Sequence, residues 1–596
     1  MYTYKIQKLT LKDGFEITPG QLTVFVGPNN SGKSRLLKDI LQLSTSNQHH
    51  TTILGSLEFT LPDDLDALLK SYHINVVLEG GDFYLRTLDS SLLKSYNLHV
   101  GGVNWSENIK SWLKRESYSD PEYRKMVQVN FANYFGNFLN TLLLTEDRLK
   151  LIKESSSGKV NLYVENLLQA FYREGIEAEN KLRKLIKSAF GIDVRLDISS
   201  LTTMSIRVGK ELDNISRDPM QSREEFEKLE RLDEQGDGIK SFISTYLSIL
   251  LGSKPVLLLD EPEAFLHPPQ TLRLGEIIAE QASEGRQIFI ATHSTDLLRG
   301  ILNIRQDVTL LRLNRENDNS TYNLLDPNEL KSISSDPLLS SSRILDGIFY
   351  KGVVVVEADS DATFYQRIAR QIRNYDDIHY AHAHNKQTVS KVALPYKNLG
   401  VKFCVIVDFD ILREKDEFDK IIKSLSFPHE EIQHLHELRK LIVEEIDAVN
   451  PNELLENLNN ELEELLLENK KNDEEVSLKL LKARRKLKKI REENSDWYKF
   501  KQAGYLALTE PNQKVFVELS TICSKRGMFI MPYGELESWL VEHGVERTSN
   551  KSRWIVTALE KIPSLQPDET KEPWLFMKKY MNTSMKQTMP NMVFLQ

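Results

Sequence analysis

Short apolar runs recur along the chain, and several of them end abruptly in polar residues. In the N-terminal part the clearest are Leu22–Val26, Val256–Leu259 and Ile288–Ile290. Runs of this length, rich in β-branched and aliphatic side chains, are typical of strands that are covered on both faces of a sheet. Segments with helical spacing lie between them, such as the apolar positions 36, 37, 40 and 41. This alternation predicts the α/β class with a parallel sheet.

The same pattern appears again in the C-terminal part. The runs GVVVV (352–356) and Val401–Val407 are separated by the helical pattern DATFYQRIARQIR. A chain of 596 residues is longer than one hydrophobic core usually serves. We therefore expect two domains, 1–345 and 346–596, with helical insertions at about 155–230 and about 412–500.

The first apolar run leads into GPNNSGKS and then into a helix pattern. This is the spacing GxxxxGKS in the strand–loop–helix context of a nucleotide-binding loop. Glycines let such a loop curl so that its N–H groups point at phosphate oxygens, and the next helix presents its positive end to the same anion. Lys33 would reach the β- and γ-phosphates of ATP, and the Ser34 hydroxyl would bind Mg²⁺. The predicted ATP-binding residues are Gly27, Asn29, Asn30, Gly32, Lys33 and Ser34.

Catalytic side chains for ATP hydrolysis follow the other two N-terminal runs. Val256–Leu259 ends in Asp260 and Glu261, and Ile288–Ile290 is followed by Thr-His-Ser with His293. Asp260 can hold Mg²⁺ through water, and Glu261 can act as the base that polarises the attacking water. His293 can sense the γ-phosphate at the end of its strand.

A glycine pair precedes the Asp260 strand in the stretch EQGDGIKSFISTYLSILL. Alone, GDG is most often a plain turn. At this position it resembles the signature loop of ATP-binding-cassette (ABC) ATPases, and the tail DEPEAFLHP, with His267, resembles their chromosome-maintenance and recombination-repair branch. The resemblance implies that ATP joins two heads, and that the signature residues of one head complete the γ-phosphate site of the other; these residues are Gly236, Asp237, Gly238 and Ser241.

The segment between the two halves of this ATP site is less informative. NFLNTLLLTEDRLKLI (137–152) predicts a strand that ends near Glu146-Asp147-Arg148, where the ABC family often carries a sensing Gln. No Gln occupies that place, so the role stays open. The charged segment 160–230 predicts a helical subdomain packed on the head.

Composition and charge narrow the class of protein. The only cysteines are Cys404 and Cys523, which excludes a disulfide framework or a Cys-based zinc site. No apolar run approaches the ~20 residues of a spanning helix, and the N-terminus lacks a signal-peptide pattern, so we expect a cytoplasmic protein without membrane contact. The net charge of −9 argues mildly against a nucleic-acid coat, although KARRKLKKIR (482–491) carries seven basic residues in ten.

Carboxylates crowd the ends of the two C-terminal runs. Glu357 and Asp361 follow the first run, and Asp408 and Asp410 follow the second. Parallel strands deliver their carboxyl ends to one edge of a sheet. Like charges held together need a cation between them, and a purely carboxylate set favours Mg²⁺ or Mn²⁺. We expect Asp359 only to cap the following helix.

The pattern VVVVEADSDATFYQRI followed by a DxD after the next strand resembles the Toprim domain of topoisomerases, primases and a group of nucleases. Ala358 departs from the usual Gly of that motif. The resemblance implies that GELESWL (534–540) adds one more metal-binding acid, Glu537, and that Asn385-Lys386 takes the place of a polar or basic position.

An ABC-type P-loop ATPase head followed by a Toprim α/β domain with a coiled-coil-like helical insertion resembles the OLD (overcoming lysogenization defect) family. That family includes the Gabija nuclease subunit, and the ATPase–Toprim pair of PARIS is similar. The resemblance implies an ATP-regulated nuclease of bacterial antiphage defence that uses ATP and Mg²⁺ or Mn²⁺. DNA is favoured over RNA as the substrate, and the assembly would be a homodimer or a higher even oligomer, with room for a second defence protein as partner.

Two other functions stay open at this point. One is an ATP-driven sensor or scaffold of a defence complex, whose Toprim domain is inert or cuts RNA only when released. The other is a structural ATPase that clamps DNA. Cleavage of plasmid or tRNA with Mg²⁺ or Mn²⁺, with and without ATP, separates the three.

Overall fold

The computed structural model describes residues 2–46, 50–87, 97–113, 120–158, 164, 166–252, 254–283, 285–316, 319–337, 343–372, 377–448, 451–471, 480–484, 486–487, 497–548, 551–568 and 570–586. The chain divides into two compact units, Met1–Ser334 and Ser335–Gln596. The break thus lies slightly before the expected one at residue 345. Among the described residues, no helix is both long and apolar enough to cross a membrane.

The first unit is built on a mixed six-stranded sheet with the order β16-β15-β3-β14-β13-β8. The strands β15, β3, β14, β13 and β8 run parallel, and β16 is antiparallel to β15 at the edge. The three predicted N-terminal strands are present and neighbour one another. Their bounds are β3 Leu22–Val26, β8 Asn140–Leu143, β13 Val256–Asp260, β14 Gln287–Ala291, β15 Val308–Glu316 and β16 Asn319–Leu325.

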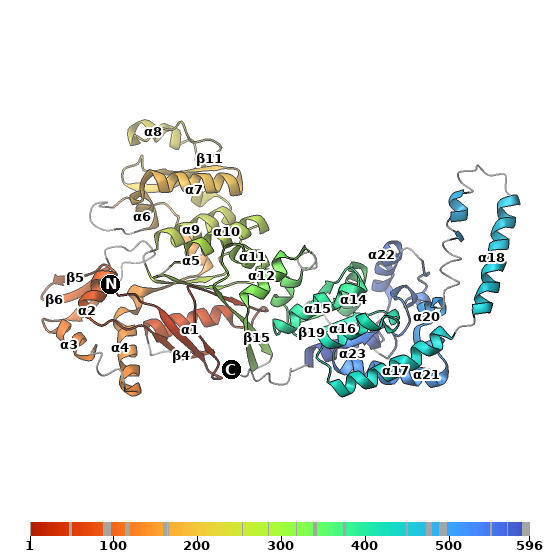
Figure 1. Cartoon of the computed structure of the whole chain (residues 1–596). Coiled ribbons are helices and arrows are strands. Elements are labelled where there is room, and N and C mark those ends of the chain that lie inside the picture. The colour runs from red at the N-terminus through yellow and green to blue at the C-terminus, as the bar shows by residue number, and fades with distance from the viewer. Residues whose placement is uncertain are drawn as a thin grey trace. The chain divides into compact units, whose positions relative to one another are not determined.

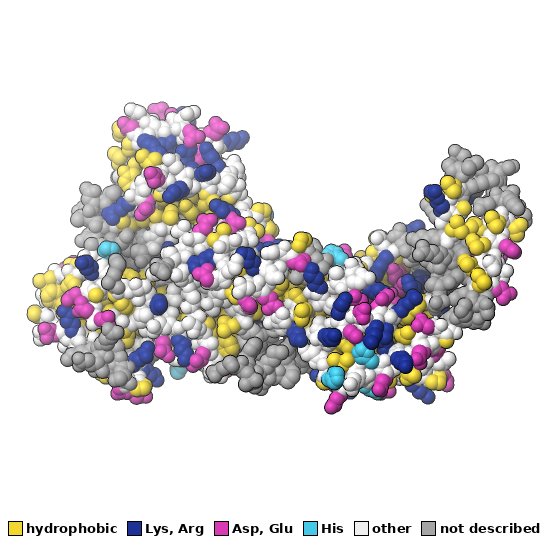
Figure 2. Space-filling view, in the orientation of Figure 1, with side chains coloured by type: hydrophobic (Ala, Val, Ile, Leu, Met, Phe, Trp, Pro, Cys, Tyr) yellow, Lys and Arg dark blue, Asp and Glu magenta, His cyan; other side chains and the backbone are white. Residues whose placement is uncertain are grey.

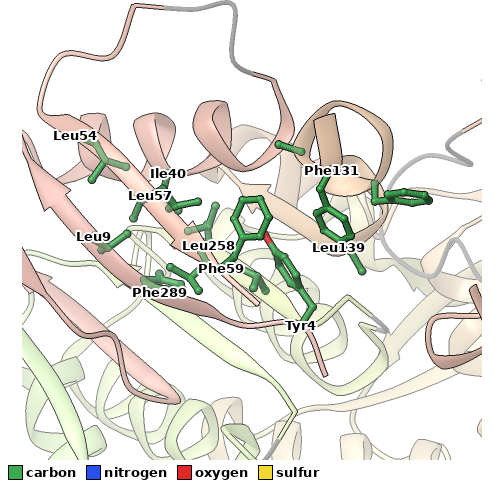
Figure 3. Packing of buried hydrophobic residues seen from close by; sticks show 14 of the residues in the cluster. Tyr4, Leu9, Ile40, Leu54, Leu57, Phe59, Phe131, Leu139, Leu258 and Phe289 are labelled. Carbon is green, nitrogen blue, oxygen red and sulfur yellow. The ribbon is translucent and has the colours of Figure 1, made fainter. Parts of the chain in front are cut away.

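Helices of the first unit surround this sheet (Figure 1), and α1 (Lys33–Thr45) buries an apolar face that includes Leu36, Leu37 and Ile40. The others that surround it are α4 Pro121–Leu139, α5 Thr145–Lys150, α9 Asp237–Leu251, α10 Pro268–Gln281, α11 Thr295–Ile304 and α12 Pro327–Ser335. On one face, α1 lies in a core with a three-stranded antiparallel sheet formed by β1 Ile6–Leu11, β2 Glu16–Ile17 and β4 Leu54–Phe59. Figure 3 shows Ile40, Leu57 and Phe59 meeting in this core.

A smaller antiparallel sheet, β5 Ile74–Glu79, β6 Asp82–Thr87 and β7 Asn97–Gly101, accompanies α2 Leu65–Ser71 and α3 Trp105–Trp112. The insertion expected to be helical, at about 155–230, contains strands as well as helices. This region holds the strands β9 Ser155–Ser156, β10 Asp193–Asp197, β11 Thr203–Gly209 and β12 Glu230–Arg231 beside α6 Leu167–Arg173, α7 Gly175–Phe190, α8 Pro219–Phe226 and η2 Leu232–Glu234.

Buried ion pairs explain why the sequence pattern was misleading there. Arg183 on α7 donates two hydrogen bonds, of 2.9 and 2.6 Å, to the carboxylate of Asp193 on β10. Both side chains are buried. This charged segment was predicted to be a helical subdomain packed on the head, whereas Arg183 and Asp193 pair across a helix–strand contact.

The second unit has a four-stranded parallel sheet with the order β18-β17-β19-β20. Its strands are β17 Gly352–Val356, β18 Ile378–His382, β19 Phe403–Val407 and β20 Met528–Ile530. All residues of β17 and β19 are buried, which explains their unbroken apolar sequence. A cluster of aromatic and aliphatic side chains from the sheet and from α14 (Asp359–Ile372), α22 (Lys551–Lys561) and α23 (Trp574–Lys586) forms the core.

The helices of the second unit are α14 Asp359–Ile372, α15 Val389–Asn398, α16 Lys415–Ser424, α17 His429–Asp447, α18 Pro451–Lys471, α20 Tyr498–Ala503, α21 Glu510–Lys525, α22 Lys551–Lys561 and α23 Trp574–Lys586, with short 3-10 turns η3 Ile344–Phe349, η4 Lys386–Thr388, η5 Phe409–Leu412, η6 Gly504–Ala507, η7 Leu536–Ser538, η8 Val541–His543 and η9 Ile562–Ser564. Helices α16, α17 and α18 occupy the segment where a helical insertion was expected. Positions 485 and 488–491 of the basic decamer lie outside the described residues. On the face seen in Figure 2, Lys and Arg side chains are interspersed with Asp and Glu.

Candidate functional site

The loop between β3 and α1 has the backbone geometry of a phosphate-binding loop. Gly27, Asn30 and Gly32 have φ values of 139°, 61° and 99°, in the region that favours glycine. A Cβ on Gly27 would lie 2.0 Å from the backbone oxygen of Leu313, so only glycine fits there. The loop therefore turns tightly and α1 begins at its end.

Lys33 is held inside this loop. Its ammonium donates hydrogen bonds of 2.8 Å to the carbonyl oxygens of both Gly27 and Pro28. Burial lowers the pKa of Lys33 to about 8, against the opposing effect of nearby carboxylates, with Glu261 the largest. An anion at the loop would favour the charged lysine, as a nucleotide phosphate does.

Ser34 and Asp260 are brought together across the sheet. The side chain of Ser34, on the first turn of α1, forms a hydrogen bond with the carboxylate of Asp260 at the end of β13. Burial raises the pKa of Asp260, and this hydrogen bond works in the opposite direction. A hydroxyl and a carboxylate side by side are a donor set that suits Mg²⁺ beside a triphosphate.

Glu261 and His293 form the pair expected at the ends of β13 and β14. The Nε2 atom of His293 lies 3.1 Å from Oε1 of Glu261. Burial, and secondarily the charge of Lys33, lowers the pKa of His293 to about 4, so its imidazole is neutral at pH 7. A neutral ring with its proton on Nε2 donates to the carboxylate and orients it.

Glu263 is a residue that the sequence reasoning missed. Its Oε1 accepts hydrogen bonds from the hydroxyl of Thr292, at 2.6 Å, and from the backbone N–H of His293, at 2.9 Å. Burial raises the pKa of Glu263. The second Glu of DEPE was the available signal, and it ties the end of β14 to the loop after β13.

Two expectations for the first unit need correction. The predicted strand near 137–152 ends at Leu143, and Glu146-Asp147-Arg148 lie in α5. Ser241 is 1% exposed, so its side chain does not reach the surface at which a nucleotide on another copy could be contacted in this conformation. It belongs to a continuous buried stretch of α9, in which every residue from 241 to 249 is buried.

The remaining signature residues lie at the start of α9. Gly236 is the N-cap, Asp237 is the first helical residue, and both are exposed. A Cβ on Gly238 would lie 2.8 Å from the backbone oxygen of Phe265, in the loop that leads to His267. The signature glycine thus permits close contact between two motifs that the sequence had only placed in order.

The second unit gathers the predicted acids at the carboxyl edge of its sheet. Strands β17 and β19 are parallel neighbours, with Val355 opposite Val405. Oε1 of Glu357 accepts a hydrogen bond of 3.0 Å from the backbone N–H of Asp408. Burial, followed by the charges of Asp410 and Asp361, raises the pKa of Glu357 to about 7. Burial and the charge of Glu357 raise the pKa of Asp408 well above its usual range.

Two lysines form ion pairs with acids of this group, and the sequence alone predicted neither ion pair. Lys551, the first residue of α22, lies 2.8 Å from Asp361, and Lys386 lies 3.0 Å from Asp410. The pKa of Lys551 is raised because the carboxylates, Asp361 and Asp408 first, outweigh the lowering effect of burial. Such long-range pairing leaves no local signal in the sequence.

The metal expectation has a mixed outcome. In the described part of the chain, no group of three or more His, Cys, Asp or Glu side chains is arranged to hold a metal ion. The donor chemistry nevertheless fits a hard cation, since Oδ1 of Asp410 is buried without a hydrogen-bond partner among the described residues. In this conformation the lysine ammonium groups supply the positive charge.

Glu537 and Asp359 flank this group differently. Glu537 is buried on η7, and burial raises its pKa while Lys551 lowers it. Asp359 is mostly exposed, with its carboxylate 3.9 Å from His382. The expected capping contact belongs instead to Asp361, whose Oδ2 accepts from the N–H of Ala358 at 3.0 Å. A residue three positions into a helix can reach back to its start.

Comparison with known proteins gives a match for part of the first unit. Residues 115–299 match the family model described as "AAA domain, putative AbiEii toxin, Type IV TA system". No match was found among the curated proteins.

Solved structures of SMC heads resemble the chain at low identity. They include an SmcHead bound to the C-winged helix domain of ScpA, with 15% identity, 55% of this chain and 99% of that chain covered, and a TM-score of 0.29. An SMC head domain from Thermotoga maritima has 17% identity, coverage of 54% and 99%, and a TM-score of 0.27. An Smc head domain with an extended coiled coil, bound to the C-terminal domain of ScpA and derived from Pyrococcus furiosus, has 14% identity, coverage of 55% and 98%, and a TM-score of 0.27.

Scores at this level do not by themselves establish a shared fold. The assignment therefore depends on the family match and on the strands that carry the two halves of the nucleotide motif. The loop before Lys33 follows β3 and the carboxylates follow β13, and both strands belong to one sheet. Strands β13 and β14 lie within the matched residues. The first unit of this chain thus carries an AAA-type P-loop ATPase domain.

Proposed function

We propose that the chain is an ATP-regulated, divalent-metal-dependent nuclease that hydrolyses phosphodiester bonds. One observation carries the nuclease part: Glu357 and Asp408 follow neighbouring parallel strands, and the Glu357 carboxylate accepts a hydrogen bond from the backbone N–H of Asp408 at one sheet edge. Together with the motif resemblance to Toprim domains, this favours a role in bacterial antiphage defence.

In the first unit, each group has a distinct task in ATP hydrolysis. Lys33 and the loop N–H groups bind the phosphates, and Ser34 and Asp260 hold Mg²⁺. Glu261 takes the proton from the attacking water, and neutral His293 keeps the Glu261 carboxylate oriented through their 3.1 Å contact. Asp237 and the signature glycines at the exposed start of α9 would face a second copy.

In the second unit, the acids Glu357, Asp361, Asp408, Asp410 and Glu537 would bind the divalent ions. Such ions activate water and stabilise the leaving oxygen of a phosphodiester. Binding requires the carboxyls to lose their protons and Lys551 and Lys386 to give up part of their contact with Asp361 and Asp410. The chain's own contribution is thus to hold closely spaced carboxylates whose repulsion a cation relieves.

A second candidate is an ATP-driven sensor whose second unit does not cut. The observation that favours it is the pairing of Lys551 with Asp361 and of Lys386 with Asp410, which already neutralises part of the acidic group.

The discriminating experiment incubates the full chain with supercoiled plasmid or with tRNA, in Mg²⁺ or Mn²⁺, with and without ATP. The nuclease proposal expects cleavage of DNA that EDTA and Glu357→Gln abolish. Cleavage of tRNA alone would move the substrate to RNA. No cleavage of either substrate, with ATP hydrolysis intact, would overturn the nuclease in favour of the sensor.

A further inference from the structure

Arg148 is a fully buried arginine at the point where two strand ends of the ATPase sheet meet. It lies on α5, just after β8, and its side chain is 0% exposed. Its Nη1 donates to the backbone oxygens of Leu143, at 3.1 Å, and Asp260, at 2.7 Å. Its Nη2 donates to Oγ1 of Thr145, at 3.1 Å, and to the backbone oxygen of Glu261, at 2.7 Å.

The acceptors of these bonds are all neutral oxygens, which is an unusual use of a buried charge. Burial lowers the pKa of Arg148 to about 10, and nearby carboxylates, Glu263 and Asp260 first, work in the opposite direction. A guanidinium removed from water is costly unless its donors are satisfied. The two shortest of its bonds go to consecutive carbonyls, those of Asp260 and Glu261.

The backbone at Glu261 needs such support. Its φ is 45°, in the left-handed region that a residue other than glycine seldom adopts. The N–H of Glu261 donates to the carbonyl of Ala291 on β14, at 2.9 Å, and its carbonyl is taken by Arg148. Both ends of the residue are therefore fixed, and the direction of its side chain toward His293 follows.

We propose that Arg148 is a positioning residue for ATP hydrolysis. Its guanidinium holds the Asp260-Glu261 backbone so that the Glu261 carboxylate stays aimed at the attacking water and the Asp260 carboxylate at Ser34. The planar guanidinium matters because its two Nη atoms donate to two adjacent carbonyls at once. The single ammonium group of a lysine does this poorly. The inference rests on the proposed catalytic role of Glu261.

The test measures steady-state ATP hydrolysis and equilibrium binding of a fluorescent ATP analogue for Arg148→Lys and Arg148→Met. Misplacement of a catalytic group by about 1 Å costs up to roughly 100-fold in rate, so kcat should fall by about 10- to 100-fold. Because the loop around Lys33 is untouched, KM and the binding constant of the analogue should stay within about twofold. The loss of kcat should be smaller in Arg148→Lys than in Arg148→Met.

A matched control and a double variant separate positioning from folding. Arg183→Lys also alters a buried arginine of the first unit, but Arg183 binds Asp193 and Asp213, so it should change stability without changing kcat. In the Glu261→Gln background, Arg148→Lys should reduce kcat by less than about twofold, since its effect works through the missing carboxylate. If Arg148→Met does not fold, Arg148→Lys alone and Arg148→Lys combined with Glu261→Gln still test the positioning role.

Three results overturn the inference. The first is an unchanged kcat in Arg148→Lys. The second is weaker nucleotide binding in that variant without a lower kcat. The third is a double variant whose fold-loss in kcat equals the product of the fold-losses of Arg148→Lys and Glu261→Gln. These are distinct from failure of the proposed function, which would show as wild-type hydrolysis by Glu261→Gln itself.

Discussion

The carboxylate of Glu357 accepts a hydrogen bond of 3.0 Å from the backbone N–H of Asp408, which joins the ends of β17 and β19. Both residues are acids at the same edge of a parallel sheet, so the bond brings their charges together rather than keeping them apart. Burial first, and then the charges of neighbouring carboxylates, raise the pKa of both residues, whereas the hydrogen bond from the Asp408 N–H lowers the pKa of Glu357. In the first unit, the contact of His293 with Glu261 likewise joins the ends of two neighbouring parallel strands, β14 and β13.

The acidic edge should be essential for nucleic-acid cleavage and dispensable for ATP hydrolysis. Glu357→Gln and Asp408→Asn keep the shape of each side chain and remove a metal-binding charge, so cleavage should fall by at least about 100-fold. ATP turnover, which uses the other unit, should stay within about twofold. Asp359→Asn is the control and should retain cleavage, because Asp359 is mostly exposed and outside the carboxylate contacts. Equal losses at positions 359 and 361 would contradict this arrangement.

Substitutions in the ATP site should separate nucleotide binding from ATP hydrolysis. Lys33→Ala removes the ammonium from the phosphate loop and should abolish nucleotide binding. Glu261→Gln should bind ATP normally and lose about 100- to 10,000-fold in kcat, the range expected for a general base. Isothermal titration and a phosphate-release assay measure the two quantities. Normal hydrolysis by Glu261→Gln would mean that another group is the base.

Assembly should depend on ATP. In the proposed function the exposed start of α9, at Gly236 and Asp237, would complete a phosphate site on another copy, so ATP-bound Glu261→Gln should sediment as a dimer or a higher even oligomer. Asp237→Trp should weaken that association because the larger side chain would crowd the contact between the copies, while ATP binding by the monomer stays intact. A species that stays monomeric with ATP bound would count against joined heads.

Stability without metal should fall as pH rises through the range in which Glu357 ionises. Its pKa is raised from 4.5 to about 7, so between these values the folded protein binds more protons than the unfolded chain, and the free energy of unfolding decreases with pH. Urea unfolding in EDTA from pH 4.5 to 8 measures the slope. Glu357→Gln should flatten the slope, and an unchanged slope in that variant would place the titration elsewhere.

Lys551 should stand in for a cation at the acidic edge. Lys551→Met leaves Asp361 and Asp408 without their counter-charge and should destabilise the metal-free protein by about 2 kcal/mol, less than for a fully buried pair because about a third of the lysine is exposed. Added Mg²⁺ should raise the Tm of Lys551→Met more than that of the wild type. Lys440→Met, which breaks the exposed i,i+4 pair with Glu444, is the control and should change neither value appreciably. Equal Mg²⁺ effects on Lys551→Met and the wild type would argue against cation binding at this edge.

Local patterns in the sequence determined the strands and the polar residues that end them. Runs such as Leu22–Val26 and 352–356 are buried on both faces of their sheets, so nearly all of their positions are apolar, with Thr23 the polar exception, and the pattern was visible without the fold. The glycines and Lys33 of the phosphate loop were visible for a similar reason, since phosphate binding requires them at fixed spacing along the chain. Asp260, Glu261, Glu357 and Asp408 were found because each directly follows such a run.

Only the tertiary structure decided which distant residues meet. Arg148 binds carbonyls more than a hundred positions away, and Lys551 binds Asp361 from a helix that follows the last strand of its sheet. Arg183 and Asp193 likewise join α7 to β10 in a segment that the sequence had predicted to be helical. Charges of this kind carry no local periodicity, because their energy depends on the partner and on burial, and both are set by the fold.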